Sequence, residues 1–227
     1  MRLGLVGRGP QAQRYLMPKN GGEHIVKQLR GRPEPAEYQE WFDDLDGVII
    51  ATHPSNHRWL CLDAIYAKKA VLCEKPLALN LEDCEEILDA AEKTGVAFDV
   101  AHVHVWATHF RRGKDPGVAH AAYHTHDRDY SAWLDWGPHV LSLMAYCYPS
   151  ADSDALRERV IVAQVPEDQP RRVHAGGYDW DYDSRTESAK TPMSLMVNSF
   201  ARGLTHNIHF NRRVYRALFA KEDHATR

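Results

Sequence analysis

Residues 47–95 read GVIIATHPSNHRWLCLDAIYAKKAVLCEKPLALNLEDCEEILDAAEKTG, and this stretch decides the fold class. Its two apolar runs, 47–52 and 70–73, have the composition of strands that are buried on both faces of a parallel sheet. Each run is followed by a segment with apolar residues at helical spacing. The second segment begins after Asn80, which forms a capping-box-like pair with Asp83, and it stops at Gly95. This alternation predicts right-handed βαβ units in a doubly wound parallel sheet.

The alternation continues on both sides of this stretch. Residues 2–6 and 24–29 predict two earlier strands, and 96–100 predicts a later one. After about residue 101 the rhythm is lost. Short strands are expected at 117–125, 158–166, 171–180 and 194–200, with one helix beginning at Asp135 and another over 209–220. The sequence therefore predicts an α/β chain with a Rossmann-type domain over residues 1–101 and a reduced α+β domain over residues 102–227.

A glycine pattern, Gly7-x-Gly9-x-x-Ala12, lies between the first predicted strand and the first helix. The first glycine permits a tight turn, and the second lets backbone N–H groups approach a pyrophosphate. The small third residue lets helix and strand pack closely. An ordinary glycine turn is the alternative, but the position at the head of a βαβ series favours dinucleotide binding.

The region that would bind the adenosine ribose has no acidic residue at the usual distance from the glycines. It reads KQLRGR (27–32), and the guanidinium groups of Arg30 and Arg32 suit a 2′-phosphate. NADP is therefore slightly favoured over NAD as the cofactor. A solvated basic turn explains the same residues equally well.

Two further patterns carry groups suited to proton transfer. Glu74-Lys75-Pro76 follows a buried strand, at the edge where open α/β sheets bind ligands, so Lys75 is a candidate contact for substrate and nicotinamide. Asp135 and His139 lie four residues apart near an expected helix start, and an imidazole that titrates near neutrality suits an acid or base. The structural alternatives are a surface lysine and a capping aspartate followed by a packing histidine.

Together these segments resemble the glucose–fructose oxidoreductase, inositol dehydrogenase and rhizopine-catabolism (Gfo/Idh/MocA) family. The resemblance is strong over residues 1–100, recoverable over 131–146 and faint elsewhere. It implies an oxidoreductase that uses NAD(P) to oxidise or reduce a carbinol of a sugar, cyclitol or sugar nucleotide. The matching cofactor-site positions are Gly7, Gly9, Ala12, Thr52, His57 and Glu74, and the matching catalytic positions are Lys75, Asp135 and His139.

Some positions depart from the family pattern. Ser142 replaces the last aspartate of the motif Asp-x-Gly-x-His-x-x-Asp, which puts a substrate contact in doubt, and Lys68 replaces the glycine that normally ends a helix. The chain is also shorter than typical members, and the loss falls in the second domain, which carries the family's oligomer interface. Specificity and assembly therefore do not transfer, and a homo-oligomer through the second domain is left open.

The composition of the chain indicates which classes of partner and which cellular location to expect. With 28 basic and 31 acidic residues the net charge is −3, so no basic field favours nucleic acid or an anionic membrane. No apolar run approaches the length of a membrane span, and the N-terminus lacks the apolar core of a signal peptide. The four cysteines show no metal-type spacing and read as free thiols, which favours a cytoplasmic location. The pairs His102-x-His104 and His124-x-His126 lack further ligands, so we expect pocket lining and no metal.

Two hypotheses for the function follow. In the first, the protein is an oxidoreductase acting on a sugar-like small molecule: His139 handles the hydroxyl proton, Asp135 orients His139, and Lys75 positions the substrate. In the second, it is a non-catalytic dinucleotide-binding sensor or regulator. Retention of Lys75, Asp135 and His139 favours the enzyme, and the shortened second domain favours the sensor.

Overall fold

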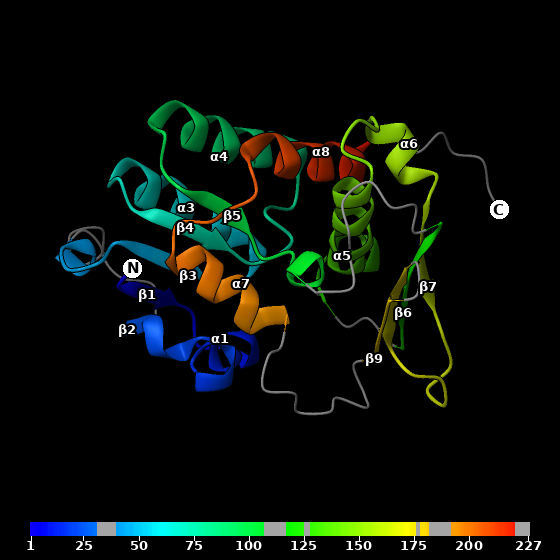
Figure 1. Ribbon diagram of the computed structural model, residues 1–227, viewed down its shortest axis with the longest axis horizontal. Helices are drawn as coiled ribbons and strands as arrows, with labels where there is room; N and C mark the ends of the chain where they lie inside the picture. Colours follow the sequence, from blue (N-terminus) through cyan, green and yellow to red (C-terminus); the bar gives the residue numbers. More distant parts are fainter. Residues whose placement is uncertain (31–39, 107–116, 125–127, 176–177, 182–191, 221–227) are drawn as a thin grey trace.

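The computed structural model describes residues 1–30, 40–106, 117–124, 128–175, 178–181 and 192–220. Two sheets lie at opposite sides of the molecule, with helix α5 between them (Figure 1). The first sheet has the order β2-β1-β3-β4-β5, and all of its neighbouring strands are parallel. Its strands are β1 (Leu3–Val6), β2 (Ile25–Leu29), β3 (Gly47–Ile50), β4 (Ala70–Cys73) and β5 (Phe98–Val100). The predicted doubly wound parallel sheet is confirmed.

Helices cover both faces of this sheet, as its strand composition requires. On β3, Val48 and Ile50 pack in one cluster with α3 (His57–Tyr66) and α4 (Leu81–Thr94). Ile49 points to the other face and packs in a second cluster with α1 (Pro10–Tyr15) and α7 (Pro192–Ala201). Because both faces are covered, every residue of β1, β3 and β4 is buried.

The helix signals in the deciding stretch correspond to observed ends. The Asn80 side chain accepts a hydrogen bond from the Asp83 N–H at 2.8 Å, so the predicted cap of α4 is confirmed. Gly95 ends α4 with φ 69°, in the left-handed region. Lys68, just after α3, has φ 60°, where glycine would be the unstrained choice.

The second sheet has the order β7-β6-β8-β9, with β6 and β7 parallel and the other neighbours antiparallel. Its strands are β6 (Ala119–Tyr123), β7 (Val160–Gln164), β8 (Arg172–Ala175) and β9 (Tyr178–Asp181). Helix α5 (Ala132–Cys147) packs against this sheet, while α6 (Ser153–Arg157) and α8 (Ile208–Phe219) lie nearby. Short 3₁₀ turns complete the elements: η1 (Pro18–Asn20), η2 (Gly22–His24), η3 (Pro54–Asn56) and η4 (Val103–Trp106). The predicted second domain with mixed helix and sheet is confirmed.

Three local expectations were wrong. The segment 194–200, expected as a strand, lies within helix α7, and the single strand expected at 171–180 is the antiparallel pair β8 and β9. Helix α5 begins at Ala132 rather than at Asp135, because the Ser131 side chain accepts from the Leu134 N–H at 3.3 Å. Asp135 therefore lies one turn inside the helix and is not its N-cap.

The last two helices return to the N-terminal layers (Figure 1). Helix α7 covers one face of the first sheet, and α8 lies against α4 and α5. The Tyr215 hydroxyl of α8 accepts a hydrogen bond from the Leu77 N–H at 2.9 Å, beyond the end of β4. The boundary expected at residue 101 stays a prediction about folding units, because contacts of this kind join the two sides of it.

Candidate active site

A cavity of 1190 Å³ extends from the carboxyl edge of the first sheet to helix α5. Its volume exceeds the roughly 300–1,000 Å³ of usual small-molecule sites, so it is large enough for more than one small ligand. Its walls come from the β1–α1 turn, the ends of β3 and β4, η4, α5 and α7. The predicted site residues that line it are Gly7, Gly9, Arg30, Thr52, Glu74, Lys75, Asp135 and His139.

The two glycines of the β1–α1 turn have different roles. Gly7 has φ 138°, and a Cβ there would lie 2.2 Å from the Ala51 carbonyl oxygen, so only glycine fits beside β3. A Cβ on Gly9 would meet nothing within 4 Å. The backbone at Gly9 therefore faces open space in the cavity, which is the cradle that a pyrophosphate requires. Ala12 is fully buried behind this turn and supplies close packing rather than a ligand contact.

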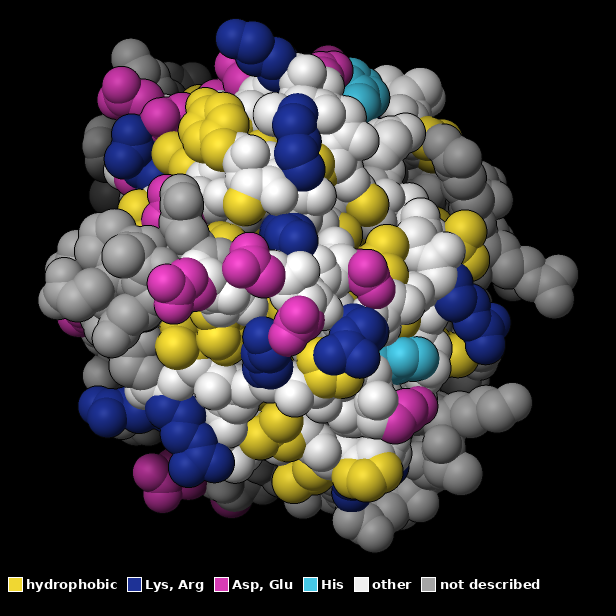
Figure 2. Space-filling model, turned by 90° about the vertical axis from the view of Figure 1, so that its left-hand side faces the viewer, with side chains coloured by type: hydrophobic (Ala, Val, Ile, Leu, Met, Phe, Trp, Pro, Cys, Tyr) yellow, Lys and Arg dark blue, Asp and Glu magenta, His cyan; other side chains and the backbone are white. Residues whose placement is uncertain are grey.

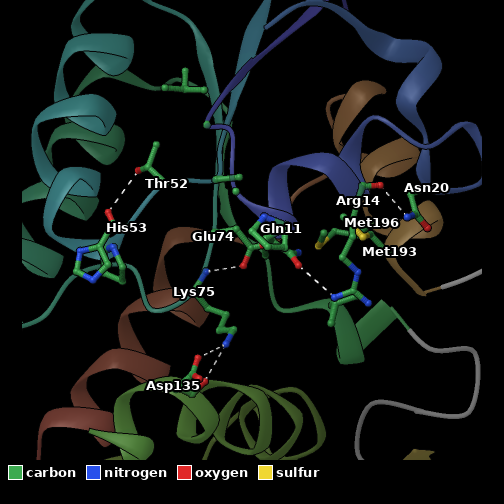
Figure 3. Close-up of a pocket in the computed structure, with 18 of the residues that line it drawn as sticks. Gln11, Arg14, Asn20, Thr52, His53, Glu74, Lys75, Asp135, Met193 and Met196 are labelled. Carbon is green, nitrogen blue, oxygen red and sulfur yellow. Dashed lines mark hydrogen bonds and ion pairs between the residues drawn. The ribbon is translucent and has the colours of Figure 1, made fainter. Parts of the chain in front are cut away.

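Glu74 fastens this turn to the end of β4. Its Oε1 accepts hydrogen bonds from Gln11 Nε2 at 2.6 Å and from the Tyr15 hydroxyl at 2.7 Å, both on α1. Its Oε2 accepts from the Lys75 N–H at 3.1 Å. Figure 3 shows Glu74 and Gln11 meeting above Lys75. Burial, followed by the negative charge of Glu74, raises the pKa of Tyr15 well above its usual range, so Tyr15 stays a hydrogen-bond donor.

His57 does not reach the cavity as a cofactor contact would. It is fully buried, with Nδ1 3.0 Å from the Pro76 carbonyl oxygen and Nε2 3.2 Å from the Thr52 carbonyl oxygen. Burial lowers the pKa of His57 to about 4. The neutral ring, which has a single N–H, donates to one of these two carbonyls and lies between the segments after β3 and β4. Thr52 itself lines the cavity.

Lys75 and Asp135 are brought together from opposite sides of the cavity. Lys75 Nζ lies 2.6 Å from Asp135 Oδ1 and 3.0 Å from the Asp135 carbonyl oxygen, and both side chains are mostly buried. Figure 3 shows the two side chains pointing toward each other, Lys75 from the segment after β4 and Asp135 from α5. This ion pair, shielded from water, holds the ammonium group at a fixed position.

His139 lines the same cavity one helical turn after Asp135, with 7% of its surface exposed. Burial first, and then the positive charge of Lys75, lowers the pKa of His139 well below its usual range. The expectation that His139 titrates near neutrality was wrong for the ligand-free protein, because the sequence did not show how completely the ring is enclosed. The Asp135 carboxylate contacts Lys75.

The cavity has a positive lining. Arg30 follows β2 and donates from Nε to Gln28 Oε1 at 2.9 Å, while Gln28 Nε2 donates to the Gly7 carbonyl at 2.9 Å. Arg32 lies outside the described residues. Among the described residues, seven lysines and arginines but only two carboxylates line the cavity. By contrast, acidic and basic side chains are interspersed on the outer face in Figure 2.

Some residues of the site were not predicted from the sequence. Gln11 and Tyr15, four residues apart on one side of α1, hold Glu74, and helical spacing is the only local sign of that role. His104 lines the cavity, as a pocket-lining histidine should, whereas His102 is fully buried outside the lining. Trp136, the residue after Asp135 on α5, also lines the cavity. No group of three or more His, Cys, Asp or Glu side chains in the described part of the chain could hold a metal ion.

Comparison with known proteins adds to this geometry. Residues 2–102 match the model of the oxidoreductase family with an NAD-binding Rossmann fold, the Gfo/Idh/MocA family. Residues 2–102 are thus similar to the NAD-binding domain of this family. The match covers the whole first sheet, from β1 to β5, and the predicted resemblance is confirmed.

Two curated relatives match parts of this domain. The chain is 48% identical over 59 residues (26% of its length) to 1,5-anhydro-D-fructose reductase of Ensifer adhaerens and covers 18% of that protein. It is 40% identical over 79 residues (32% of its length) to an α-N-acetylgalactosaminidase of Shewanella oneidensis and covers 17% of it. The chain thus matches less than a fifth of either relative.

A solved structure shows the same fold over nearly the whole chain. It is a dehydrogenase of Thermus thermophilus in complex with NAD and UDP-GlcNAcA, with a TM-score of 0.65 at 15% identity. The match covers 96% of this chain and 94% of that one. No helix in the described part of the present chain is long and apolar enough to cross a membrane.

Proposed function

We propose that the protein is an NAD(P)-dependent oxidoreductase that transfers a hydride between nicotinamide and a carbinol or carbonyl of a sugar-like substrate. The observation that carries this proposal is the ion pair of Lys75 and Asp135 in the cavity that also contains Gly9 and His139. A cation, its carboxylate partner and an imidazole thus lie in one cavity with a dinucleotide cradle. The family match of residues 2–102 supports the cofactor class.

Lys75, Asp135 and His139 have different roles in the proposed reaction. Bound NAD(P) supplies the hydride acceptor or donor. The Lys75 ammonium donates a hydrogen bond to the reacting oxygen and stabilises negative charge on it, and Asp135 holds that ammonium in place. His139, neutral because of its burial, accepts the hydroxyl proton during oxidation and returns it during reduction.

A polyhydroxylated substrate fits the remaining lining. Trp136 and Tyr130 provide flat surfaces for sugar faces near Asp135 and His139. The names of two similar proteins, an anhydrofructose reductase and a dehydrogenase complexed with a nucleotide sugar acid, point to the same class. We propose a sugar, cyclitol or sugar nucleotide as the substrate.

For the cofactor, we propose that NADP is slightly favoured over NAD. Arg30 lies at the end of β2, where an acidic residue would select the free ribose, and its guanidinium suits a 2′-phosphate. Titration of the intrinsic tryptophan fluorescence with NADPH and NADH measures the preference, because Trp59 and Trp136 line the cavity. We expect a Kd for NADPH in the micromolar range, about −8 kcal/mol. Equal affinities for the two cofactors would contradict the preference but not the family.

The catalytic proposal is tested by separating cofactor binding from turnover. Lys75→Ala and His139→Ala should bind NADPH as the unaltered protein does, yet lose turnover by about 10²–10⁴-fold on any sugar or cyclitol that the unaltered protein accepts. Lys93→Ala, an exposed lysine on α4, is the matched control and should keep full activity. Unimpaired turnover in either cavity variant would refute the catalytic assignment.

The alternative function is a dinucleotide-binding sensor, and the binding and turnover measurements would distinguish it from an enzyme. Such a protein binds NADPH but converts none of a broad panel of sugars, cyclitols and sugar nucleotides. The similarity to an α-N-acetylgalactosaminidase also calls for product analysis alongside nicotinamide absorbance, because a net hydrolysis leaves that absorbance unchanged.

We further propose a cytoplasmic location and a homo-oligomer formed through the second sheet. All four cysteines are free thiols, which suits a reducing compartment. Ile161 on β7 is 46% exposed, and His120 and His174 face each other across β6 and β8 on exposed positions. Light scattering of the purified protein, with Ile161→Lys as the variant, tests this interface. A monomer at micromolar concentration would contradict it.

A further inference from the structure

An arginine of α1, Arg14, lines the cavity and is held in place from two sides. It lies three residues after Gln11 and therefore on the same side of the helix. Arg14 Nη1 donates to Gln11 Oε1 at 3.2 Å, and Gln11 Nε2 donates to Glu74 Oε1 at 2.6 Å. Figure 3 shows this chain of contacts from Arg14 to Glu74, next to Lys75. The Asn20 side chain donates to the Arg14 carbonyl oxygen at 2.8 Å, so the backbone is fixed as well.

The strand order separates Arg14 from the expected ribose site. In the first sheet β2 and β4 lie on opposite sides of β1, and Arg30 follows β2 whereas Glu74 follows β4. Because Gln11 reaches Glu74, the side of α1 that carries Gln11 and Arg14 faces the β4 half of the cavity. That half also contains the proposed catalytic ion pair. Arg14 thus lies on the side where the substrate is expected, and Arg30 on the side of the adenosine.

The cavity holds more positive charge than its own carboxylates balance. Of its two described carboxylates, Glu74 is bound by α1 and Asp135 by Lys75. Within the described part of the chain, the Arg14 side chain contacts the neutral amide of Gln11 and no carboxylate. A guanidinium presents five N–H donors in a planar fork, and it binds a phosphate or carboxylate through two parallel hydrogen bonds. Arg14 therefore retains donors for an anionic ligand.

Helix α7 supplies an apolar wall next to α1. Met193 and Met196 line the cavity and pack in one cluster with Ala12 and Tyr15 of α1. Thioether side chains offer a ligand no hydrogen-bond donor. They also exclude water, and the attraction between a guanidinium and an anion is weakened less where water is excluded. This wall therefore favours a charged contact with Arg14.

We propose that Arg14 forms a subsite for a phosphate or carboxylate group of the substrate, so that the protein acts on an anionic sugar or cyclitol rather than on a neutral one. The inference rests on the proposed function and narrows its substrate class. The diphosphate of the cofactor offers the same oxyanion chemistry, and Gly9 at the start of α1 belongs to its expected cradle. The experiment therefore has to separate these two sources.

Calorimetric titration of the NADPH-saturated protein tests the subsite while the cofactor phosphates occupy their own site. The probes are inorganic phosphate, glucuronate and UDP-glucose, with glucose as the neutral counterpart. Arg14→Gln removes the charge, and Arg14→Lys keeps the charge without the planar fork. Arg202→Gln, at an exposed position just after α7, is the matched control.

We expect the unaltered complex to bind phosphate, and to bind at least one of the two anionic sugars roughly tenfold more tightly than glucose. In Arg14→Gln the Kd for these anions should rise about 10–100-fold, while the Kd for NADPH stays within about twofold. Arg14→Lys should recover part of the affinity for phosphate, and Arg202→Gln should retain all of it. With an anionic substrate, KM should rise in Arg14→Gln and kcat should change little.

Several outcomes would overturn the subsite. It is refuted if the unaltered NADPH complex binds none of the anions, or if it binds them as tightly in Arg14→Gln. A tenfold or larger loss of NADPH affinity in Arg14→Gln would assign Arg14 to the cofactor diphosphate instead. A higher kcat/KM for neutral sugars than for their anionic counterparts would also refute it, and would leave the proposed function intact.

Failure of the proposed function has a different signature. If the unaltered protein binds no dinucleotide, the oxidoreductase proposal fails, and phosphate titration of the ligand-free protein and of Arg14→Gln still decides whether the anion site exists. Should Arg14→Gln not fold, Arg14→Met gives the same comparison, because it keeps an unbranched side chain without the charge.

Discussion

At the scale of single residues, Gly7 and Gly9 differ in their surroundings although both belong to the same glycine motif. Gly7→Ala should destabilise the protein by about 3 kcal/mol or more, because the residue combines φ 138° with a Cβ position 2.2 Å from a backbone oxygen. Gly9→Ala should keep the free energy of unfolding within about 1 kcal/mol, since its Cβ meets no atom within 4 Å. Urea unfolding measures both changes.

The same pair separates stability from ligand binding. The methyl group of Gly9→Ala would occupy the space where a pyrophosphate meets the backbone, so the Kd for NADPH should rise by roughly tenfold or more. Fluorescence titration of the folded variant measures it. Wild-type affinity in Gly9→Ala would mean that the cofactor phosphates lie elsewhere.

At Lys68, by contrast, a substitution by glycine should stabilise the protein. It is exposed and has φ 60°, a conformation that costs a residue with a Cβ roughly 1 kcal/mol. Lys68→Gly should therefore raise the free energy of unfolding by up to about 1 kcal/mol. Lys68→Ala keeps the backbone strain and is the control, so a gain of the same size in Lys68→Ala would assign the effect to the side chain.

At the scale of elements, local patterns predicted the first sheet better than the second half. The apolar runs around Ile49 and Leu72 could only be strands buried on both faces, and the structure has them so. In α7 the buried positions Met193, Met196, Val197 and Phe200 have helical spacing, but the apolar run was taken for a strand. The spacing was the better guide there.

Some residues of the candidate site could likewise be predicted from local patterns, and others could not. Lys75 and His139 were found because each lies in a short motif beside a recognisable strand or helix. The ring contact of His104 with His139 joins segments 35 residues apart in the numbering, and the Glu74 bond to Tyr15 joins two that are 59 apart. No local pattern specifies which segments the tertiary fold brings into contact, so such pairs need the structure.

The start of α4 gives an element-scale prediction. Asn80 is exposed and caps the helix by accepting from the Asp83 N–H at 2.8 Å. Asn80→Ala should lower the free energy of unfolding by about 1 kcal/mol, and Asn80→Ser should restore most of it. Thermal or urea unfolding followed by far-UV circular dichroism measures the change. Equal stabilities of the alanine and serine variants would show that the cap contributes nothing.

At the scale of the whole molecule, the buried histidines set its response to acid. Burial lowers the pKa values of His57, His102 and His104 to about 4, 3 and 3, against 6.5 for an exposed ring, and His139 follows the same direction. As the pH falls below about 6.5, these histidines become protonated in the unfolded chain but stay neutral in the folded chain. Stability should therefore decline toward pH 4, by about 1.4 kcal/mol per pH unit for each such histidine.

Urea unfolding at pH 7.5 and at pH 5.5 measures this loss, which we expect to total about 3–6 kcal/mol. His102→Phe should reduce the loss by about 1 kcal/mol, because one buried ring no longer titrates. His209→Gln, at an exposed position on α8, should leave it unchanged. A stability that is independent of pH over this range would mean that these rings are accessible to water.

The packing of α7 on the first sheet has a consequence for synthesis of the chain. Leu3, Leu5, Ile49 and Leu72 are made early, but the partners that cover them, Met196 and Phe200 among others, come more than 120 residues later. At roughly 5–20 residues per second, the part of that face that α7 covers stays exposed for about 6–25 s after β4 has been made, while α1 is already available to cover the rest. During this interval the nascent chain exposes aliphatic surface of the sheet, and we expect it to bind ribosome-associated chaperones until α7 has been synthesised.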